Sequence, residues 1–175
     1  MAQEIARPQM KVGDLFAYRT SGGPEAPKLW TETVVEVLPG GRYIVRIDGE
    51  PRGPRLVEYD GPGNVVQPPP WPSLKFMQFP IAIGKSWTHA VNDTVAQTRT
   101  VTYRAVTMET FASAAGTLDC ARIEGIETTG NSGVTIPASV KLWYCPAARA
   151  IARKETTIPV AGRVVLELTD LKLAP

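Results

Sequence analysis

The chain passes through one pattern twice. Gly13 opens the first copy and Gly84 opens the second, and in each copy two ring side chains follow the glycine, two residues apart. A run of β-branched residues comes next, then an alternating segment that contains Arg-Ile, at Arg46-Ile47 in one copy and Arg122-Ile123 in the other. Each copy then has a segment that ends in tyrosine before a turn. Turn and strand residues repeated in this order predict a duplicated β-architecture.

The repeat divides one domain of ordinary size into two halves. We expect residues 1–175 to form a single domain, with pseudo-repeated halves at about 12–66 and 79–173. Residues 67–72 contain four prolines around one tryptophan, and consecutive prolines keep a chain extended. This segment is therefore expected to be a stiff connector between the halves.

Strands separated by glycine and proline turns account for most of the chain. The clearest hairpin joins residues 30–38 to residues 42–48 through Pro39-Gly40-Gly41, in a register that places Val35 opposite Val45 and keeps one face apolar. No amphipathic helix of ten or more residues is found. The fold class predicted is all-β: antiparallel sheets of about 10–12 strands that form a sandwich or an open, curved barrel, with little or no helix.

The other strands are predicted from the same alternation. They are expected at residues 12–19, 55–59, 65–66, 76–83, 86–91, 98–109, 118–126, 139–144, 150–158 and 163–173. The small polar residues of 128–137 are expected to form a loop.

Composition excludes several classes of protein. With 43% apolar residues the chain can build a core, and its net charge of +2 is too balanced for a nucleic-acid-binding face. The nearest approach to a basic cluster is Arg42, Arg52 and Arg55, which are expected to lie in solvated loops. The apolar stretches fall far short of the roughly 20 residues that a membrane span needs.

The two cysteines, Cys120 and Cys145, set a testable register. If their strands pair antiparallel with the cysteines opposite each other, charged and ring side chains share one face and apolar residues share the other. The pairs expected are Arg122–Trp143 and Glu124–Lys141 on one face, and Ala121–Tyr144, Ile123–Leu142 and Gly125–Val140 on the other. This sorting favours a disulfide, which indicates an oxidising compartment. The alternative is two buried free thiols in a cytosolic protein.

The start of the chain is consistent with export. It has neither a basic n-region nor an apolar h-region, and Ala2-Gln3 resembles the pair that flanks a signal-peptidase cut. We therefore expect a mature periplasmic or secreted protein whose leader is absent from this sequence.

The sequence contains few groups suited to catalysis. His89 is the only histidine, and a hydrolase would have to use it with Ser86 and Asp93, although no Gly-x-Ser-x-Gly motif is present. A strand-face histidine is the simpler interpretation. Asp119, Glu124 and Glu127 are expected to be solvent-facing charges. A metal site is not expected because there is one histidine and no Cys-x-x-Cys motif, and no cofactor motif is found.

The rings are the remaining candidates for a site. A curved sheet can enclose an apolar cavity that binds a small ligand. The residues that could line it are Phe16, Tyr18, Trp30, Trp87 and Tyr103, with Trp143 as a further ring. Packing in an ordinary core is the alternative for all of them.

Three segments of the second half resemble a known signature. Residues 79–87, 115–124 and 142–146 resemble motifs of exported bacterial β-proteins grouped as domains of unknown function, and the resemblance extends over about residues 79–170. Leu118 stands where that signature has phenylalanine, and Ala148 or Arg149 stands where it has glycine.

The resemblance implies a location in the cell envelope and an antiparallel sheet, curved like that of outer-membrane lipoprotein carriers. It provides no catalytic residues to transfer. The function expected is that of a non-enzymatic exported envelope protein that binds a partner or an apolar small molecule. The alternatives are a structural or assembly module of the envelope, and a hydrolase that uses His89.

Overall fold

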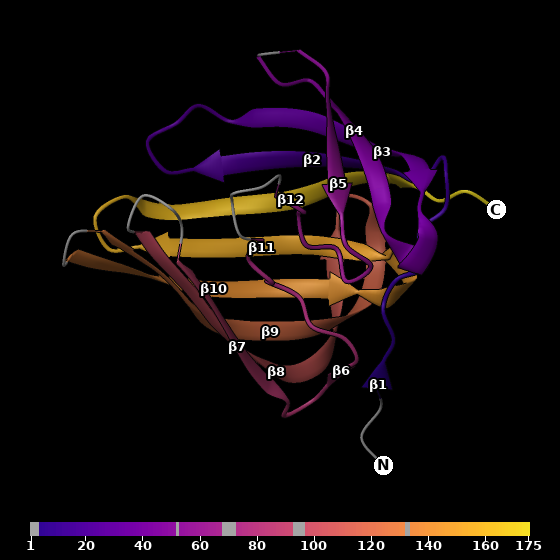
Figure 1. Ribbon diagram of the computed structural model, residues 1–175. Helices are drawn as coiled ribbons and strands as arrows, with labels where there is room; N and C mark the ends of the chain where they lie inside the picture. Colours follow the sequence, from indigo (N-terminus) through magenta and orange to yellow (C-terminus); the bar gives the residue numbers. More distant parts are fainter. Residues whose placement is uncertain (1–3, 52, 68–72, 93–96, 132–133) are drawn as a thin grey trace.

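Ten strands form one open antiparallel sheet, and two short strands form a second (Figure 1). The computed structural model describes residues 4–51, 53–67, 73–92, 97–131 and 134–175. In order across the large sheet the strands are β5 (Arg55–Tyr59), β4 (Tyr43–Asp48), β3 (Lys28–Val37), β2 (Leu15–Gly22), β12 (Gly162–Lys172), β11 (Ala150–Ile158), β10 (Val134–Cys145), β9 (Gly116–Asn131), β8 (Gln97–Ser113) and β7 (Ser86–Asn92). The small sheet pairs β1 (Glu4–Ile5) with β6 (Ile81–Ala82). The all-β prediction is confirmed, and the sheet is curved without closing into a barrel.

The repeat is visible in the order of the strands. We call β2–β5 the first repeat and β7–β10 the second repeat; each is a meander of four strands. The hairpin β11–β12 joins them, because β11 pairs with β10 and β12 pairs with β2. Figure 1 shows the chain between β5 and β7 crossing the sheet.

Each repeat has an equivalent backbone hydrogen bond at its glycine turn. Gly13 donates its N–H to the carbonyl of Val34 at 2.8 Å, and Gly84 donates to the carbonyl of Ala105, also at 2.8 Å. Both glycines have positive φ, 95° and 90°, a conformation that side chains disfavour. A β-bulge follows each acceptor along its strand. The repeated glycine of the sequence therefore marks the same turn in both halves.

The bulges also correct the expected registers. In the first repeat the bulge places Val34 opposite Val45 and leaves Val35 exposed, so the predicted pairing of Val35 with Val45 is wrong. An inserted residue reverses the faces of the residues beyond it, and no local feature of the sequence indicates such an insertion. For the same reason Val45, rather than Ile47, is the structural counterpart of Ile123, since each lies opposite the acceptor of its glycine bond.

The second repeat has longer strands than predicted. Residues 128–131 and 134–137 extend β9 and β10 instead of forming a loop, with Thr128 opposite Pro137 and Gly130 opposite Thr135, and residues 132–133 lie outside the described part of the chain. Their small polar side chains are compatible with a strand pair that faces solvent. By contrast, the strands expected at 65–66 and 76–83 reduce to an isolated bridge between Tyr59 and Val65, and to β6. Residues 68–72 of the expected connector lie outside the described part of the chain.

The register predicted for the cysteine hairpin is confirmed. Arg122 lies opposite Trp143 and Ile123 opposite Leu142. Cys120 and Cys145 are fully buried and joined by a disulfide, with Cα atoms 4.1 Å apart. The bond ties β9 to β10 and has no counterpart in the first repeat.

A buried ion pair connects the start of β2 to the turn between β10 and β11. Asp14 is fully buried, and Arg149 Nη1 lies 3.0 and 2.7 Å from its two carboxylate oxygens. The carboxylate also accepts hydrogen bonds from the backbone N–H groups of Lys11 and Ala174. Arg149 is one of the two residues, with Ala148, that could stand at the glycine position of the signature that residues 142–146 resemble, and its φ of 57° is in the region that favours glycine. The ion pair offsets the strain of that conformation.

Candidate ligand-binding cavity

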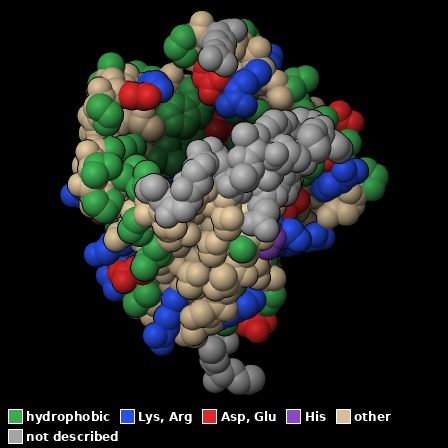
Figure 2. Space-filling model, turned by 60° about the vertical axis from the view of Figure 1, so that its left-hand side comes forward, with side chains coloured by type: hydrophobic (Ala, Val, Ile, Leu, Met, Phe, Trp, Pro, Cys, Tyr) green, Lys and Arg blue, Asp and Glu red, His purple; other side chains and the backbone are tan. Residues whose placement is uncertain are grey.

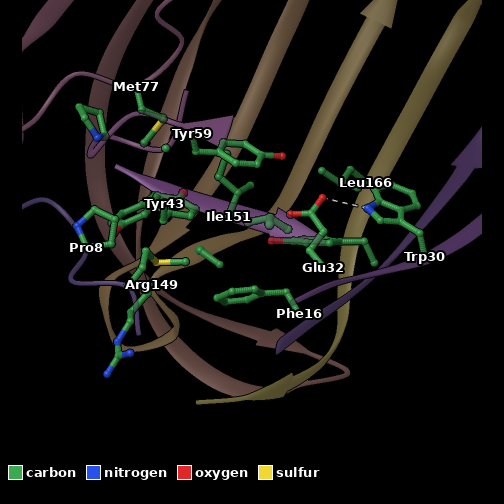
Figure 3. Close-up of a pocket in the computed structure, with 17 residues that line it drawn as sticks. Pro8, Phe16, Trp30, Glu32, Tyr43, Tyr59, Met77, Arg149, Ile151 and Leu166 are labelled. Atoms are coloured by element: carbon green, nitrogen blue, oxygen red, sulfur yellow. Dashed lines mark hydrogen bonds between the residues drawn. The ribbon is translucent and has the colours of Figure 1, made fainter. Parts of the chain in front are cut away.

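A cavity of about 170 Å³ lies on the inner side of the first repeat, where it meets β10 and β11 (Figure 3). Its walls are mainly apolar and aromatic. They are formed by Pro8, Met10, Phe16, Tyr18, Trp30, Glu32, Tyr43, Val45, Tyr59, Pro62, Gly63, Met77, Tyr144, Arg149, Ala150, Ile151 and Leu166. An apolar cavity of about 150 Å³ is large enough to bind benzene, so a small organic molecule fits this space.

Glu32 is the acidic residue in the cavity wall. It alternates along β3 with Trp30 and Val34, so all three side chains point to the inner side of the sheet. Trp30 Nε1 donates a hydrogen bond of 3.0 Å to one oxygen of the Glu32 carboxylate. Within the described residues this is the one hydrogen bond the carboxylate receives. Figure 3 shows the carboxylate between the side chains of Tyr59 and Phe16, facing Trp30.

Tyrosine rings surround the carboxylate. Tyr43 and Tyr59 stack with their centroids 5.3 Å apart, and Tyr18 packs against Trp30 at 5.7 Å. Burial raises the pKa of all three phenols, and the charge of Glu32 raises the pKa of each further. The hydroxyls therefore stay protonated, and the rings that line the cavity are neutral.

The environment of Glu32 disfavours its charge. Burial raises the pKa of its carboxyl group, and this effect outweighs the opposing hydrogen bond from Trp30 and the field of Arg55. The field of Glu50 adds to the increase. Arg55 is itself held by a bidentate ion pair with Glu50, at 2.7 and 2.9 Å.

A larger cleft of about 590 Å³ lies beside the cavity. It is bounded by the loop before β3, the turn after β4 and the turn between β11 and β12. Trp30 lines both spaces, so its indole is a shared wall between the cleft and the inner cavity. Figure 2, which brings this end of the molecule forward, shows a hollow with hydrophobic walls and acidic atoms at its base. A ligand could reach the cavity from this side past a single side chain.

The aromatic residues that the sequence analysis named lie in different parts of the structure. Phe16, Tyr18 and Trp30 are among the residues that line the cavity. Trp87 and Tyr103 pack edge to face in the core of the second repeat, with centroids 5.9 Å apart and 5% and 1% of their surface exposed. They are core residues, and their predicted place in the cavity wall is wrong.

Trp143 also lies elsewhere. Its ring stacks on Phe111 at 5.4 Å, and its Nε1 donates a hydrogen bond to Glu109. It shares the face of β10 that carries the disulfide, whereas the neighbouring Tyr144 points to the cavity.

The cavity residues that the sequence analysis missed include Glu32, Tyr43 and Tyr59. A signal for Glu32 was present, because it occupies an alternate position between Trp30 and Val34, where a half-buried strand normally has an apolar residue. No comparable local signal marks Tyr43 or Tyr59, which are typical strand residues.

A second ion pair, between Glu127 of β9 and Lys154 of β11, lies on the inner face of the sheet where the second repeat meets β11. Lys154 Nζ donates to Glu127 Oε1 at 2.6 Å, and Tyr103 donates its hydroxyl to the same oxygen. The ammonium also lies over the ring of Phe76, 5.1 Å from its centroid. This pair is satisfied by residues of the chain itself.

The geometry does not assemble a triad on His89. Its Nδ1 accepts a hydrogen bond from the backbone N–H of Lys75 at 3.3 Å, and Ser86 lies three positions away on β7, which places it on the opposite face. Asp93 lies outside the described residues. Among the residues that are described, no cluster of three or more histidine, cysteine, aspartate or glutamate side chains could hold a metal ion.

Known proteins match this chain in structure and not in sequence. It matches no protein-family model and no curated protein. A predicted lipoprotein from Parabacteroides distasonis superimposes with a TM-score of 0.61 at 15% identity, over 97% of this chain and 100% of that one. A predicted exported protein with a YmcC-like fold from Bacteroides fragilis has a TM-score of 0.58 at 12% identity, over 96% and 99%. The hypothetical lipoprotein YmcC from Escherichia coli has 0.50 at 13%, over 95% and 87%.

These likenesses show the fold, which is YmcC-like. The neighbours are described as exported proteins or lipoproteins, the class that the signature in residues 79–170 implied, and none is described as an enzyme. The signature itself has no matching family model. No helix in the described part of the chain has the length and hydrophobicity needed to cross a membrane.

Proposed function

We propose that this chain is a non-enzymatic protein of the bacterial cell envelope that binds a small ligand, apolar over most of its surface, in the cavity around Glu32. The observation that carries the proposal is an aromatic-lined space of about 170 Å³ in the wall of an otherwise packed sheet. The space is partly open to solvent, and a mainly apolar pocket with a few polar groups is the usual form of a small-ligand site. An apolar ligand would remove the aromatic walls from water.

The polar groups of the cavity support binding rather than catalysis. Glu32 has no second carboxylate among the residues that line the space, and Arg149, which also lines it, is held by Asp14. General acid–base chemistry at a sugar needs two carboxyl groups at a defined separation. One carboxylate among rings instead fixes the orientation of a bound molecule.

Two observations support the location in the envelope. The disulfide between Cys120 and Cys145 is typical of an oxidising compartment. The structural neighbours are described as exported proteins or lipoproteins. Fractionation of the source cells, with detection by antibody, would place the protein in the envelope or the medium; recovery from the cytosol would contradict the proposal.

Filling the cavity tests the binding site. We expect benzene and 3,3-dimethyl-1-butanol to shift the NMR signals of Phe16 and Tyr43 in the unmodified protein, and to leave those signals unchanged in Ile151→Trp. Ile126→Trp is the matched control, since Ile126 is exposed on β9. Equal binding by Ile151→Trp, or no binding of either probe by the unmodified protein, would refute the cavity as a ligand site.

A further inference from the structure

We infer that the ligand of this cavity is a small organic cation, with an ammonium group held against Glu32 and its alkyl groups packed against the surrounding rings. The inference rests on the proposed function, because it names the chemical class that the proposed site would select. It follows from the partners of the carboxylate, from the rings around it and from a comparable arrangement elsewhere in the same molecule.

The Glu32 carboxylate lacks a cationic partner in the described structure. It accepts one hydrogen bond, from the neutral indole of Trp30. A carboxylate can accept about four hydrogen bonds, and Glu32 is half-buried, so its remaining acceptor sites are open to a ligand in the cavity. A ligand that brings positive charge would form an ionic interaction there.

The nearby cations of the chain are engaged elsewhere. Arg149 lines the cavity, but its guanidinium binds Asp14 and points away from Glu32 in Figure 3. Arg55 forms its bidentate pair with Glu50 and influences Glu32 only through its field. Neither forms a hydrogen bond to the Glu32 carboxylate.

The rings favour a cation over an anion or a strongly polar neutral ligand. Tyr18, Tyr43, Tyr59 and Trp30 line the cavity, and the face of an aromatic ring attracts a cation within about 6 Å of the ring centroid. Aromatic cages bind alkylated ammonium groups, because the methyl groups pack in the apolar space and the positive charge is attracted to the rings. A sugar would require more hydrogen-bonding groups than one carboxylate and three phenols provide.

A comparable arrangement lies where the second repeat meets β11. The Lys154 ammonium of β11 lies between the carboxylate of Glu127 and the ring of Phe76. The cavity of the first repeat has a carboxylate and rings, and no lysine is among the residues that line it. The ligand would supply the ammonium group there.

The test compares probes of matched shape by calorimetry. Tetramethylammonium and choline carry the charge, and 3,3-dimethyl-1-butanol is the neutral isostere of choline. We expect choline to bind at least tenfold more tightly than the isostere, and Glu32→Gln to abolish that preference while leaving the affinity for the isostere unchanged. Glu36→Gln is the control, because Glu36 is an exposed residue of the same strand.

A pH series on the unmodified protein is independent of any variant. The groups that face or influence Glu32 are Tyr18, Tyr43, Tyr59, Arg55, Glu50 and the cavity-lining Arg149. Burial raises the pKa of the Glu32 carboxyl group, so choline affinity should fall as the pH falls, and the affinity for the isostere should stay constant.

The outcomes separate the two proposals. Equal affinity of choline and the isostere, or an unchanged preference in Glu32→Gln, would overturn the cationic ligand while leaving a binding cavity in place. If benzene, choline and the isostere all fail to bind the unmodified protein, both proposals are overturned.

Discussion

The two repeats have the same backbone plan and different interiors. Glu32 in the first repeat and Tyr103 in the second occupy the same place relative to the glycine turn and the bulge. Tyr103 lies between Trp87 on one neighbouring strand and Gly125 on the other. Glu32 lies between Phe16 and Ile47. The second repeat is packed, and the first is left with a cavity.

The difference has two physical sources. In the second repeat a large ring fits because Gly125 has no side chain there; a Cβ on it would lie 2.0 Å from the carbonyl oxygen of Thr102. The segment that carries Leu74 and Ile81 also packs against that interior. The first repeat has a shorter side chain at the central position, and the segments over it, which include Met10 and Met77, line the cavity without filling it. The same hydrogen-bonded frame can thus support a core or a site.

The largest effect is expected from truncation at the two equivalent positions. Tyr103→Ala should lower the free energy of unfolding by about 3–5 kcal/mol, because a buried ring is removed and a cavity remains. Glu32→Ala should change it by less than about 1 kcal/mol, because a partly desolvated carboxylate is removed from existing space. Urea unfolding of both variants would measure the difference, and equal losses would show that the first repeat is as tightly packed as the second.

The disulfide stabilises only the second repeat directly. Replacing Cys120 and Cys145 by alanine should reduce the free energy of unfolding by roughly 3 kcal/mol, since a cross-link over a sequence separation of 25 residues restricts the unfolded chain. Amide hydrogen exchange should show the largest loss of protection in β9 and β10. A loss spread evenly over both repeats would mean that they unfold as one unit.

A methyl group at Gly125 should disturb the packed interior. Gly125→Ala is expected to cost about 1–3 kcal/mol, because the new Cβ must displace Tyr103 or the backbone of β8. Thermal unfolding measures the loss. The double variant Gly125→Ala with Tyr103→Leu should recover part of it, and no recovery would place the strain in the backbone rather than the ring.

The smallest effect is a pH dependence that originates in the first repeat. Burial raises the pKa of Glu32 above its value in the unfolded chain, so the folded state binds this proton more tightly. The contribution to stability is fully present below the unfolded pKa and is lost as the pH rises through the folded pKa. The difference in melting temperature between the unmodified protein and Glu32→Gln should therefore change across weakly acid pH. A constant difference would mean that the carboxyl group titrates normally.

The sequence by itself determined the strand class, the duplicated plan and the cysteine register. Glycine turns, alternation with a period of two and the face-sorting around Cys120 and Cys145 act over a few residues, so they can be read locally. Gly13 and Gly84 show this directly, because a backbone with positive φ favours glycine at that position.

Only the tertiary structure decided the bulges, the pairing of β12 with β2 and the contents of each interior. Val35 and Val45 were paired wrongly because one inserted residue reverses a face without changing composition. The sequence analysis grouped the rings of both halves as candidates for one cavity. The sequence could not separate them, because the space beside a side chain depends on strands that are distant in sequence. Glu32 and Tyr103 are each ordinary strand residues until the residue opposite, Ile47 or Gly125, fixes the volume that remains.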